Sequence, residues 1–263
     1  MHHENNGTGA RWDDALAETR IGSQKRRTLG IVPARGGSKG VPHKNIAPLL
    51  GKPMLAYTAE AALASRRLTR VILSTEDAEI ARVGIACGLD VPFMRPADLA
   101  QDDTPTIPVL QHAVRALASA GEIFDAVVVL QPTTPLRQPE DVDGAIELLF
   151  RTRADSVISF VEVGDGHPAR MKFLDRDGRV LDPPFAEGCE GQRRQDLPKL
   201  YLRAGSVYVT RTPVLMEQNS LKGSDCRAWV IPPERACNVD TPFDLFLAEQ
   251  MLRFRNQCVN VAS

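Results

Sequence analysis

The segment Leu29–Asn45 reads LGIVPARGGSKGVPHKN and is the most informative part of the sequence. It opens with a short apolar run, Leu29–Val32, of the kind that forms a buried β-strand. A turn that contains adjacent glycines and several cations follows directly. Adjacent glycines let backbone N–H groups turn toward a bound anion without a clash from Cβ. The segment therefore predicts a strand that leads into an anion-binding loop.

Short apolar runs alternate with helical patterns along the rest of the chain. Strands are predicted at Leu29–Val32, Val71–Ser74, Ala126–Leu130, Ser156–Val163, Val207–Thr210 and Ala228–Ile231. Helices are predicted at Met54–Leu63, Asp77–Cys87, Ile107–Ala118, Pro139–Phe150 and Phe243–Phe254. This alternation predicts an α/β fold with a mostly parallel sheet and right-handed crossovers. In such sheets ligands bind beyond the carboxyl ends of the strands, so we expect the site there.

The same pattern divides the chain into parts. Residues 1–27 are polar and are predicted to be a disordered extension that lacks the apolar core of a signal peptide. Residues 28–263 form the main domain. Within it, the segment 164–200 is rich in glycine, proline and charge. That composition interrupts the alternation of strands and helices and predicts an inserted arm.

Charge and cysteine content limit the function classes that fit the chain. Its 263 residues carry 32 basic and 33 acidic side chains, for a formal net charge of -1. This balance gives no reason to expect nucleic acid or an anionic membrane as a partner. The five cysteines are dispersed, which is typical of reduced thiols in the cytoplasm. No apolar run approaches the roughly 18 residues of a membrane-spanning helix.

Three cations of the first loop, Arg35, Lys39 and Lys44, could offset much of the charge of a triphosphate. The loop matches neither the GxxxxGK[ST] pattern of a P-loop nor the GxGxxG pattern of a dinucleotide site. Taken alone, a glycine-rich turn with solvated cations explains the segment as well as a phosphate site does.

Several further motifs follow the loop in order. They are Arg95–Ala100 with Asp103–Thr104, Leu130–Arg137 (LQPTTPLR), Arg194–Pro198 (RQDLP) with Gly205 and Tyr208, and Asn238–Thr241 (NVDT). With the loop, they resemble the signature of the CMP-sialic acid synthetase family, the acylneuraminate cytidylyltransferases, which are related to the CMP-Kdo synthetases. The resemblance implies a three-layer Rossmann-like nucleotidyltransferase fold in which the segment 164–200 is a dimerisation arm, so a homodimer is expected.

The resemblance also implies a reaction, the transfer of CMP from CTP to an acidic acceptor of the sialic acid type with release of pyrophosphate. Arg35, Lys39 and Lys44 would be catalytic, because displacement at phosphorus needs charge neutralised on the phosphate oxygens. The implied nucleotide-binding residues are Gly36, Gly37, Ser38, Asn45, Arg95, Thr104 and Thr106. Arg95 could instead form an ion pair with Asp98 or Asp102.

The remaining motifs would serve the acceptor and a metal ion. The implied acceptor-binding residues are Gln131, Thr133, Thr134, Arg194, Gln195 and Tyr208. Asp240 and Asn238 are the candidate ligands of Mg²⁺ or another divalent cation, because hard carboxylate and amide oxygens suit it. Asp240 could instead cap the final helix, and Arg137 could be a structural fork for a carboxylate.

The sequence departs from the sialic acid enzymes at three places. Asn238 replaces an aspartate, and Ala204 replaces an asparagine before Gly205. Leu221–Lys222 stands where a pair of phenylalanines helps enclose the sugar, and a lysine there would indicate a smaller or more anionic acceptor. Two alternatives therefore stay open: CMP transfer to a phosphonate or a Kdo-like sugar, and a non-catalytic CTP-binding protein.

Overall fold

The computed structural model describes residues 26–37, 40–189 and 191–262. Its strands are β1 (Thr28–Pro33), β2 (Pro48–Leu49), β3 (Lys52–Pro53), β4 (Arg70–Ser74), β5 (Ala126–Val129), β6 (Ser156–Glu162), β7 (Phe173–Leu174), β8 (Val180–Leu181), β9 (Tyr201–Arg211) and β10 (Cys226–Val230). Its helices are α1 (Met54–Leu63), α2 (Ala78–Ala86), α3 (Thr106–Ser119), α4 (Pro139–Thr152), α5 (Thr212–Met216) and α6 (Pro242–Ala262).

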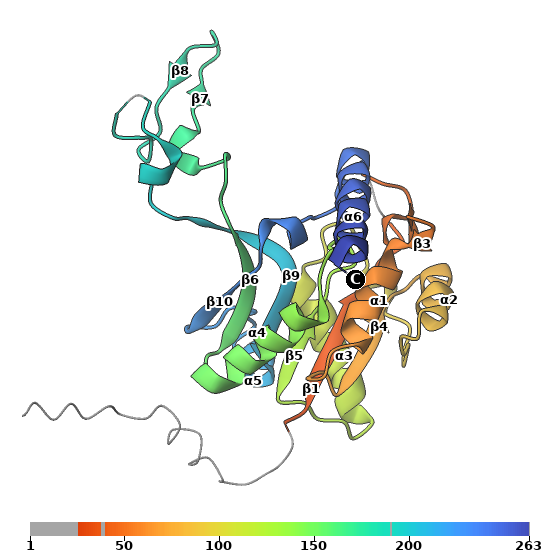
Figure 1. The fold of residues 1–263 in the computed structure, drawn as a ribbon. Coiled ribbons are helices and arrows are strands. Elements are labelled where there is room, and N and C mark those ends of the chain that lie inside the picture. Colours follow the sequence, from red (N-terminus) through yellow and green to blue (C-terminus); the bar gives the residue numbers. More distant parts are fainter. Residues whose placement is uncertain (1–25, 38–39, 190, 263) are drawn as a thin grey trace, which may run out of the picture.

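A six-stranded sheet with the order β10-β6-β9-β5-β1-β4 forms the centre of the molecule (Figure 1). β1 pairs in parallel with β4 and β5, and β10 pairs in parallel with β6. Only β9 runs the other way, antiparallel to both β5 and β6. The prediction of a mostly parallel sheet is confirmed, and the carboxyl ends of β1, β4, β5 and β6 share one edge.

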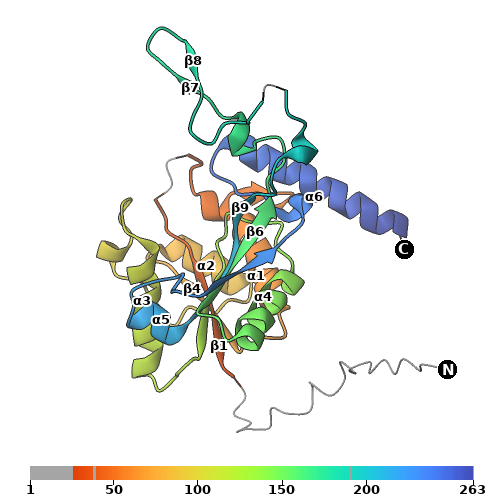
Figure 2. The same cartoon turned by 90° about the vertical axis from the view of Figure 1, so that its left-hand side faces the viewer.

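Helices cover both faces of this sheet, which gives three layers (Figure 2). Along β5, Ala126 and Val128 pack into the core beneath α1, α2 and α4, while Val127 and Val129 pack into the core beneath α3 and α5. Because side chains alternate between faces, a strand that is covered on both sides must be apolar at every position. β5 is fully buried, as its unbroken apolar sequence predicts.

Local sequence signals place the helix starts. The Asp77 side chain accepts hydrogen bonds from the N–H groups of Glu79 and Ile80, at 2.8 and 3.0 Å, and caps α2. Gln138 and Asp141 form a capping box at the start of α4. Such caps satisfy N–H groups that have no partner within the helix, so α2 and α4 begin where the sequence predicts.

The structure differs from the sequence prediction mainly in extent. β9 begins at Tyr201 rather than at Val207, because residues 201–203 pair with residues 160–162 at the end of β6. α6 continues past Phe254 to Ala262. The short hairpin β2–β3 and the helix α5 were not predicted, since each is too short to show a periodic pattern.

The chain leaves the sheet after β6 and returns at β9. In between, the small hairpin β7–β8 projects away from the body (Figure 1). None of the helices that the structure describes is long and apolar enough to cross a membrane. Of the five cysteines, Cys258 lies beyond the described side chains and the other four are unpaired thiols.

Candidate functional site

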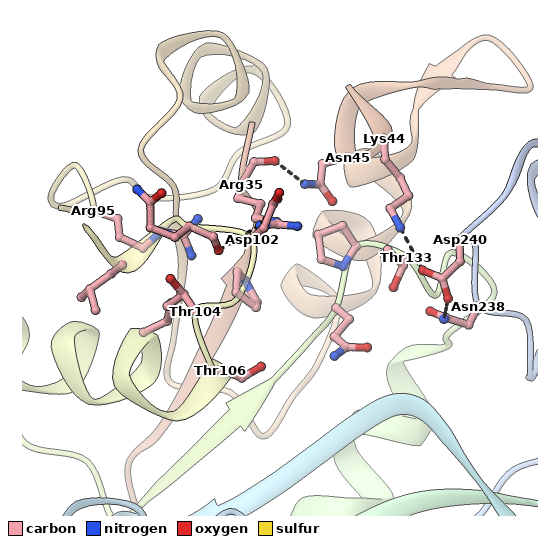
Figure 3. A pocket seen from close by; sticks show the side chains of 16 residues that line it. Arg35, Lys44, Asn45, Arg95, Asp102, Thr104, Thr106, Thr133, Asn238 and Asp240 are labelled. Carbon is pink, nitrogen blue, oxygen red and sulfur yellow. Dashed lines mark hydrogen bonds and ion pairs between the residues drawn. The ribbon is translucent and has the colours of Figure 1, made fainter. Parts of the chain in front are cut away.

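A cleft of about 450 Å³ opens at the edge of the sheet where the parallel strands end. It is lined by Pro33, Arg35, Lys44, Asn45, Arg95, Leu99, Gln101, Asp102, Thr104, Thr106, Val109, Gln131, Pro132, Thr133, Asn238 and Asp240 (Figure 3). Residues from four of the predicted motifs therefore share one cavity. Lys39 and Ser38 lie outside the described residues.

Arg35 lies on one wall of the cleft, just after β1. Its guanidinium is 2.9 Å from the Asp102 carboxylate and donates to the Gln101 carbonyl oxygen, also at 2.9 Å. The buried Asn45 side chain donates to the Arg35 carbonyl oxygen at 2.9 Å. These bonds fix the backbone of the loop and tie Arg35 to the segment before α3.

Lys44 and Asp240 lie side by side on the wall of the cleft that faces Arg35 (Figure 3). The Lys44 ammonium is 2.9 Å from a carboxylate oxygen of Asp240, although 196 positions separate the two residues in the sequence. Gly40 allows this approach, because a Cβ at that position would overlap the carbonyl oxygen of Asp240. The first loop and the segment before α6 are therefore in direct contact.

Asp240 does not cap the final helix with its side chain. Thr241 and Asp244 cap it instead. The Thr241 N–H donates to the Asp244 carboxylate at 2.7 Å, and the Asp244 N–H donates to the Thr241 hydroxyl at 3.2 Å. This reciprocal pair is a capping box. The Asp240 carboxylate is 61% exposed and points into the cleft, where a cation could reach it.

Arg95 forms an ion pair, although with neither of the partners that the sequence suggested. Its buried guanidinium is 2.6 Å from the Glu76 carboxylate and donates to the Ala34 carbonyl oxygen at 3.2 Å. The other Glu76 oxygen accepts from the Gly36 N–H at 2.7 Å. Glu76 thus joins Arg95 to the glycine turn, and Gly36 and Gly37 are not among the residues that line the cleft.

Gln131 and Thr133 line the cleft after β5, as expected for the carboxyl end of a central strand. The Thr133 carbonyl oxygen accepts from the Val239 N–H at 2.8 Å, which holds the segment of Asn238 and Asp240 against this loop. Thr134 does not reach the cleft: it is 1% exposed and its hydroxyl donates to the Gln131 carbonyl oxygen at 3.0 Å. The geometry gives Thr134 a supporting position rather than a contact with the acceptor.

Arg194 and Gln195 are not brought into this cleft within one chain. Tyr208 is not among its lining residues, but its hydroxyl lies 4.0 Å from the position that a Cβ on Gly205 would take, close to Gln131. Arg194 and Gln195 line a separate hollow at the base of the arm, and Arg194 is 3.0 Å from Asp165. Tyr208 lies on β9 against the core beneath α3 and α5, and burial raises the pKa of its hydroxyl. His167 is 5% exposed and uses both ring nitrogens in hydrogen bonds with backbone groups, so its role is structural.

The position of Leu221–Lys222 corrects an inference from the sequence. The Thr210 hydroxyl donates to the Leu221 carbonyl oxygen and the Ser156 hydroxyl donates to that of Lys222, at 2.8 and 2.6 Å. Ser156 is the first residue of β6, so the dipeptide lies at the edge of the sheet opposite the cleft. Within one chain the lysine therefore lies away from the cleft.

The donor set at Asp240 fits a hard divalent cation that keeps water and takes phosphate oxygens as further ligands. Asp240 offers an exposed carboxylate, and Asn238, whose amide donates to it, offers an amide oxygen beside it. No group of three or more His, Cys, Asp or Glu side chains suited to a metal occurs among the described residues. A metal held here would therefore depend on a bound triphosphate for most of its ligands.

A larger cavity, of about 830 Å³, lies at the opposite edge of the sheet and includes Arg66 and Arg67. Arg67 is paired with Glu147 at 2.6 Å, and none of the predicted motifs contributes to the lining. The carboxyl-end cleft, where four motifs meet, is therefore the candidate functional site despite its smaller volume.

Comparison with known proteins adds independent information. The cytidylyltransferase family model matches residues 29–175. A pseudaminic acid cytidylyltransferase of Campylobacter jejuni is 32% identical over 88% of this chain and 98% of its own. A CMP-N,N'-diacetyllegionaminic acid synthase of Legionella pneumophila is 29% identical over 89% and 99%. N-acylneuraminate cytidylyltransferase A of Danio rerio is 31% identical over 95% of this chain and 57% of its own.

Solved structures with the same fold include a CMP:2-keto-3-deoxy-manno-octonic acid synthetase in complex with CTP. It superimposes with a TM-score of 0.66 over 87% of this chain and 99% of its own, at 18% identity. A 4-diphosphocytidyl-2C-methyl-D-erythritol synthase of Anaerococcus prevotii gives a TM-score of 0.59 at 13% identity, over 88% of this chain and 100% of its own. At these identities the likeness establishes the three-layer fold.

Proposed function

The chain belongs to the cytidylyltransferase family, and we propose that it transfers CMP from CTP to a nonulosonic acid with release of pyrophosphate. One observation carries this proposal. Lys44 and Asp240, which are 196 positions apart in the sequence, pair in a cleft that Arg35, Asn45 and Gln131 also line. A cation, a carboxylate for a metal and polar groups for an acceptor are the parts that this reaction needs.

The chemistry is a displacement at phosphorus. A hydroxyl oxygen of the acceptor forms a bond to the α-phosphorus of CTP, and the bond from that phosphorus to the oxygen that links it to the β-phosphorus breaks. This oxygen leaves with pyrophosphate, and the hydroxyl proton passes to solvent. Arg35 and Lys44 would neutralise charge on the phosphate oxygens as it shifts toward pyrophosphate. Both are held by carboxylates in the free protein, so the triphosphate would compete with Asp102 and Asp240 for them.

Asp240, with Asn238 beside it, would hold Mg²⁺ against the phosphates. The bound ion would polarise phosphate oxygens and neutralise their charge. Lys44 would then turn from the carboxylate to the nucleotide, which keeps an ammonium close to the α-phosphate. Asn45 and the threonines of the opposite wall, Thr104 and Thr106, would contact the nucleoside.

The names of the relatives and the polar residues at one end of the cleft support a nonulosonic acid as the acceptor. The named relatives act on pseudaminic, N,N'-diacetyllegionaminic and N-acylneuraminic acids, which are all nonulosonic acids. Gln131 and Thr133 would bind the acceptor next to Gly205 on β9. Ala204 lies at this same end and lacks an amide, so we expect the choice among these acids to be made there. A cytoplasmic site of action is proposed as well, in keeping with its unpaired thiols.

The arm supports a homodimer as the working form. Phe173, Leu174, Val180 and Leu181 of its hairpin are 48% to 70% exposed, a cluster that a partner surface would cover. A second copy would also bring Arg194 and Gln195 from its own arm to the acceptor end of this cleft. We expect light scattering to give twice the chain mass, and L174D to give the mass of one chain. A wild-type monomer at all concentrations would contradict the dimer.

An acceptor screen tests the function. Purified protein is incubated with CTP, Mg²⁺ and one acid at a time: pseudaminic, N,N'-diacetyllegionaminic, N-acetylneuraminic, Kdo or a small phosphonate. We expect pyrophosphate and a CMP-linked product with at least one of the first three acids, and none when ATP or GTP replaces CTP. CTP binding without turnover of any acid would favour a non-catalytic CTP-binding protein, and turnover of Kdo or the phosphonate alone would change the acceptor class.

A further inference from the structure

Arg137 is a fully buried cation at the base of the cleft. It follows the loop after β5 and is 2% exposed. Burial lowers the pKa of its guanidinium to about 9, yet the group stays protonated at neutral pH. Burying a charge costs free energy unless hydrogen bonds satisfy it. The hydrogen-bond partners of Arg137 therefore indicate the role of this residue.

The guanidinium joins the loop after β5 to β9 and to α1, two elements that are remote from it in sequence. Its Nε donates to the Ser206 carbonyl oxygen on β9 at 2.6 Å, and Nη2 donates to the Gln131 carbonyl oxygen after β5 at 2.8 Å. Nη1 donates to the Thr58 hydroxyl at 3.0 Å, and Nη2 also donates to the Thr134 hydroxyl. A planar fork with several donors can hold such a divergent set of acceptors, whereas the ammonium of lysine cannot reproduce it.

No carboxylate contacts this cation within the described part of the chain. The nearest acidic influence is Asp141, but its two oxygens accept from the Gln138 N–H and from Arg235, each at 3.0 Å. A simple ion pair, which was one interpretation of the sequence, is therefore not the reason for Arg137. Two of its four acceptors are backbone carbonyl oxygens at the acceptor end, those of Gln131 and Ser206.

These partners determine the geometry beside Gln131. The pairing of β6 with β9 is irregular between Ile158 and Phe160, and the residues of β9 opposite this break include Gly205 with a φ of 71°. A Cβ at Gly205 would lie 3.3 Å from the Gln131 side-chain oxygen. Gly205 and Gln131 are thus close neighbours. Arg137 donates to the carbonyl oxygen of Ser206, which follows Gly205, and to the carbonyl oxygen of Gln131 itself.

We propose that Arg137 is a positioning residue that fixes Gln131 against the Gly205 bulge and thereby sets the affinity of the enzyme for its acid acceptor. This inference rests on the proposed function, since it assigns the Gln131 end of the cleft to the acceptor. The nucleotide end is held by other contacts, namely Arg35 with Asp102 and Lys44 with Asp240. Loss of the Arg137 bridge should therefore weaken acceptor binding and leave CTP binding nearly unchanged.

Steady-state kinetics with CTP and pseudaminic acid separate these effects. We expect R137M to raise KM for the acid about ten-fold or more, as for the loss of a partner that orients a ligand-binding group. KM for CTP should stay within about two-fold, and R137K should restore part of the acceptor affinity. D155N is the matched control, because Asp155 accepts three hydrogen bonds from Ser224 and Asp225 at the far edge of the sheet.

T58V keeps the proposal testable if R137M does not fold. This variant preserves shape and removes one acceptor of the guanidinium, and we expect KM for the acid to rise about three-fold. An unchanged acceptor KM in T58V and R137M would overturn the proposal. An equal rise in the KM values of both substrates would also overturn it, because it would indicate a general loss of structure.

Hydrogen exchange gives a result that does not depend on activity. In R137M or T58V, amides of residues 131–136 and 203–207 should exchange faster, whereas those of residues 40–47 should match wild type. Uniformly faster exchange, or no change, would overturn the proposal. Wild-type protein that turns over no acid would instead refute the proposed function, so the two failures can be told apart.

Discussion

Replacing Asp240 by asparagine should abolish most activity at little cost in stability. The carboxylate is 2.9 Å from the Lys44 ammonium, but its side chain is 61% exposed. A bare Coulomb energy at this distance is about 1.4 kcal/mol in water. Exposed ion pairs contribute only about 0–1 kcal/mol net. We therefore expect D240N to change the free energy of unfolding by less than about 1 kcal/mol, which for a chain of this size shifts Tm by at most about 2–4 °C.

The effect on catalysis should be much larger. Asp240 is the one carboxylate that we assign to the metal, and an amide is a weaker ligand without charge. Removal of one preorganised electrostatic group costs about a hundred- to a thousand-fold in rate. We expect a loss of this size in kcat/KM, with partial recovery at high Mg²⁺ concentration.

Asp244 provides the control, since it caps α6 from the first turn of the helix and accepts from the Asp240 N–H at 3.1 Å. D244N should cost about 0.5–2 kcal/mol of stability through the lost cap, yet lower kcat/KM only about ten-fold. Pyrophosphate release at varied CTP and Mg²⁺, together with thermal unfolding of both variants, measures this contrast. If D240N kept more than a tenth of the wild-type kcat/KM, Asp240 would not be the metal ligand.

Two further predictions concern the approach of the loop and the response to acid. G40A should raise KM for CTP about ten-fold, because its methyl group displaces the loop from the Asp240 carbonyl, and it should destabilise the protein by about 1–3 kcal/mol. G164A is the control, since a methyl group at that position meets no atom within 4 Å. Equal KM values in the two variants would contradict the contact. Hydrogen bonds from Asp225 and Ser224 lower the pKa of Asp155, so its stabilising effect is complete above the unfolded-state pKa of about 3.9 and is lost as pH falls through the lower folded value. The Tm difference between wild type and D155N should therefore be constant from pH 7 to about 5 and should disappear below pH 4. A constant difference down to pH 2.5 would refute this.

The regular part of the fold was predictable from the sequence because its signals are local. The unbroken apolar run at Ala126–Leu130 requires a strand covered on both faces, and Asp77 starts a helix through its own side chain. The length of β9 was not predictable in this way. Residues Tyr201–Ser206 lie between the predicted arm and the predicted strand and were assigned to neither, and they become strand only because the end of β6 lies beside them.

The site was predictable where a motif follows a strand. Arg35, Lys44 and Gln131 were expected in one cleft on that ground, and they line it together with Asp240. The supporting residues were missed because their partners are distant in sequence. Glu76 has no motif, although it joins Arg95 to the glycine turn, and Asp102 entered only as a possible partner of Arg95 rather than of Arg35.

The inference about Leu221–Lys222 failed for a related reason. It assumed that a position in the sequence corresponds to a position at the cleft, whereas hydrogen bonds to Thr210 and Ser156 hold this dipeptide at the other edge of the sheet. Only the direction of the strands, which the sequence pattern leaves open for β9, shows which edge each loop occupies.

A crystal structure of the protein with CTP and Mg²⁺ tests the central claim most directly. We expect the triphosphate to lie between the loop of Arg35 and Lys44 and the carboxylate of Asp240, with the metal bound to Asp240 and to phosphate oxygens. A triphosphate bound elsewhere, such as beside Arg66 at the opposite edge of the sheet, or a metal without contact to Asp240, would contradict it.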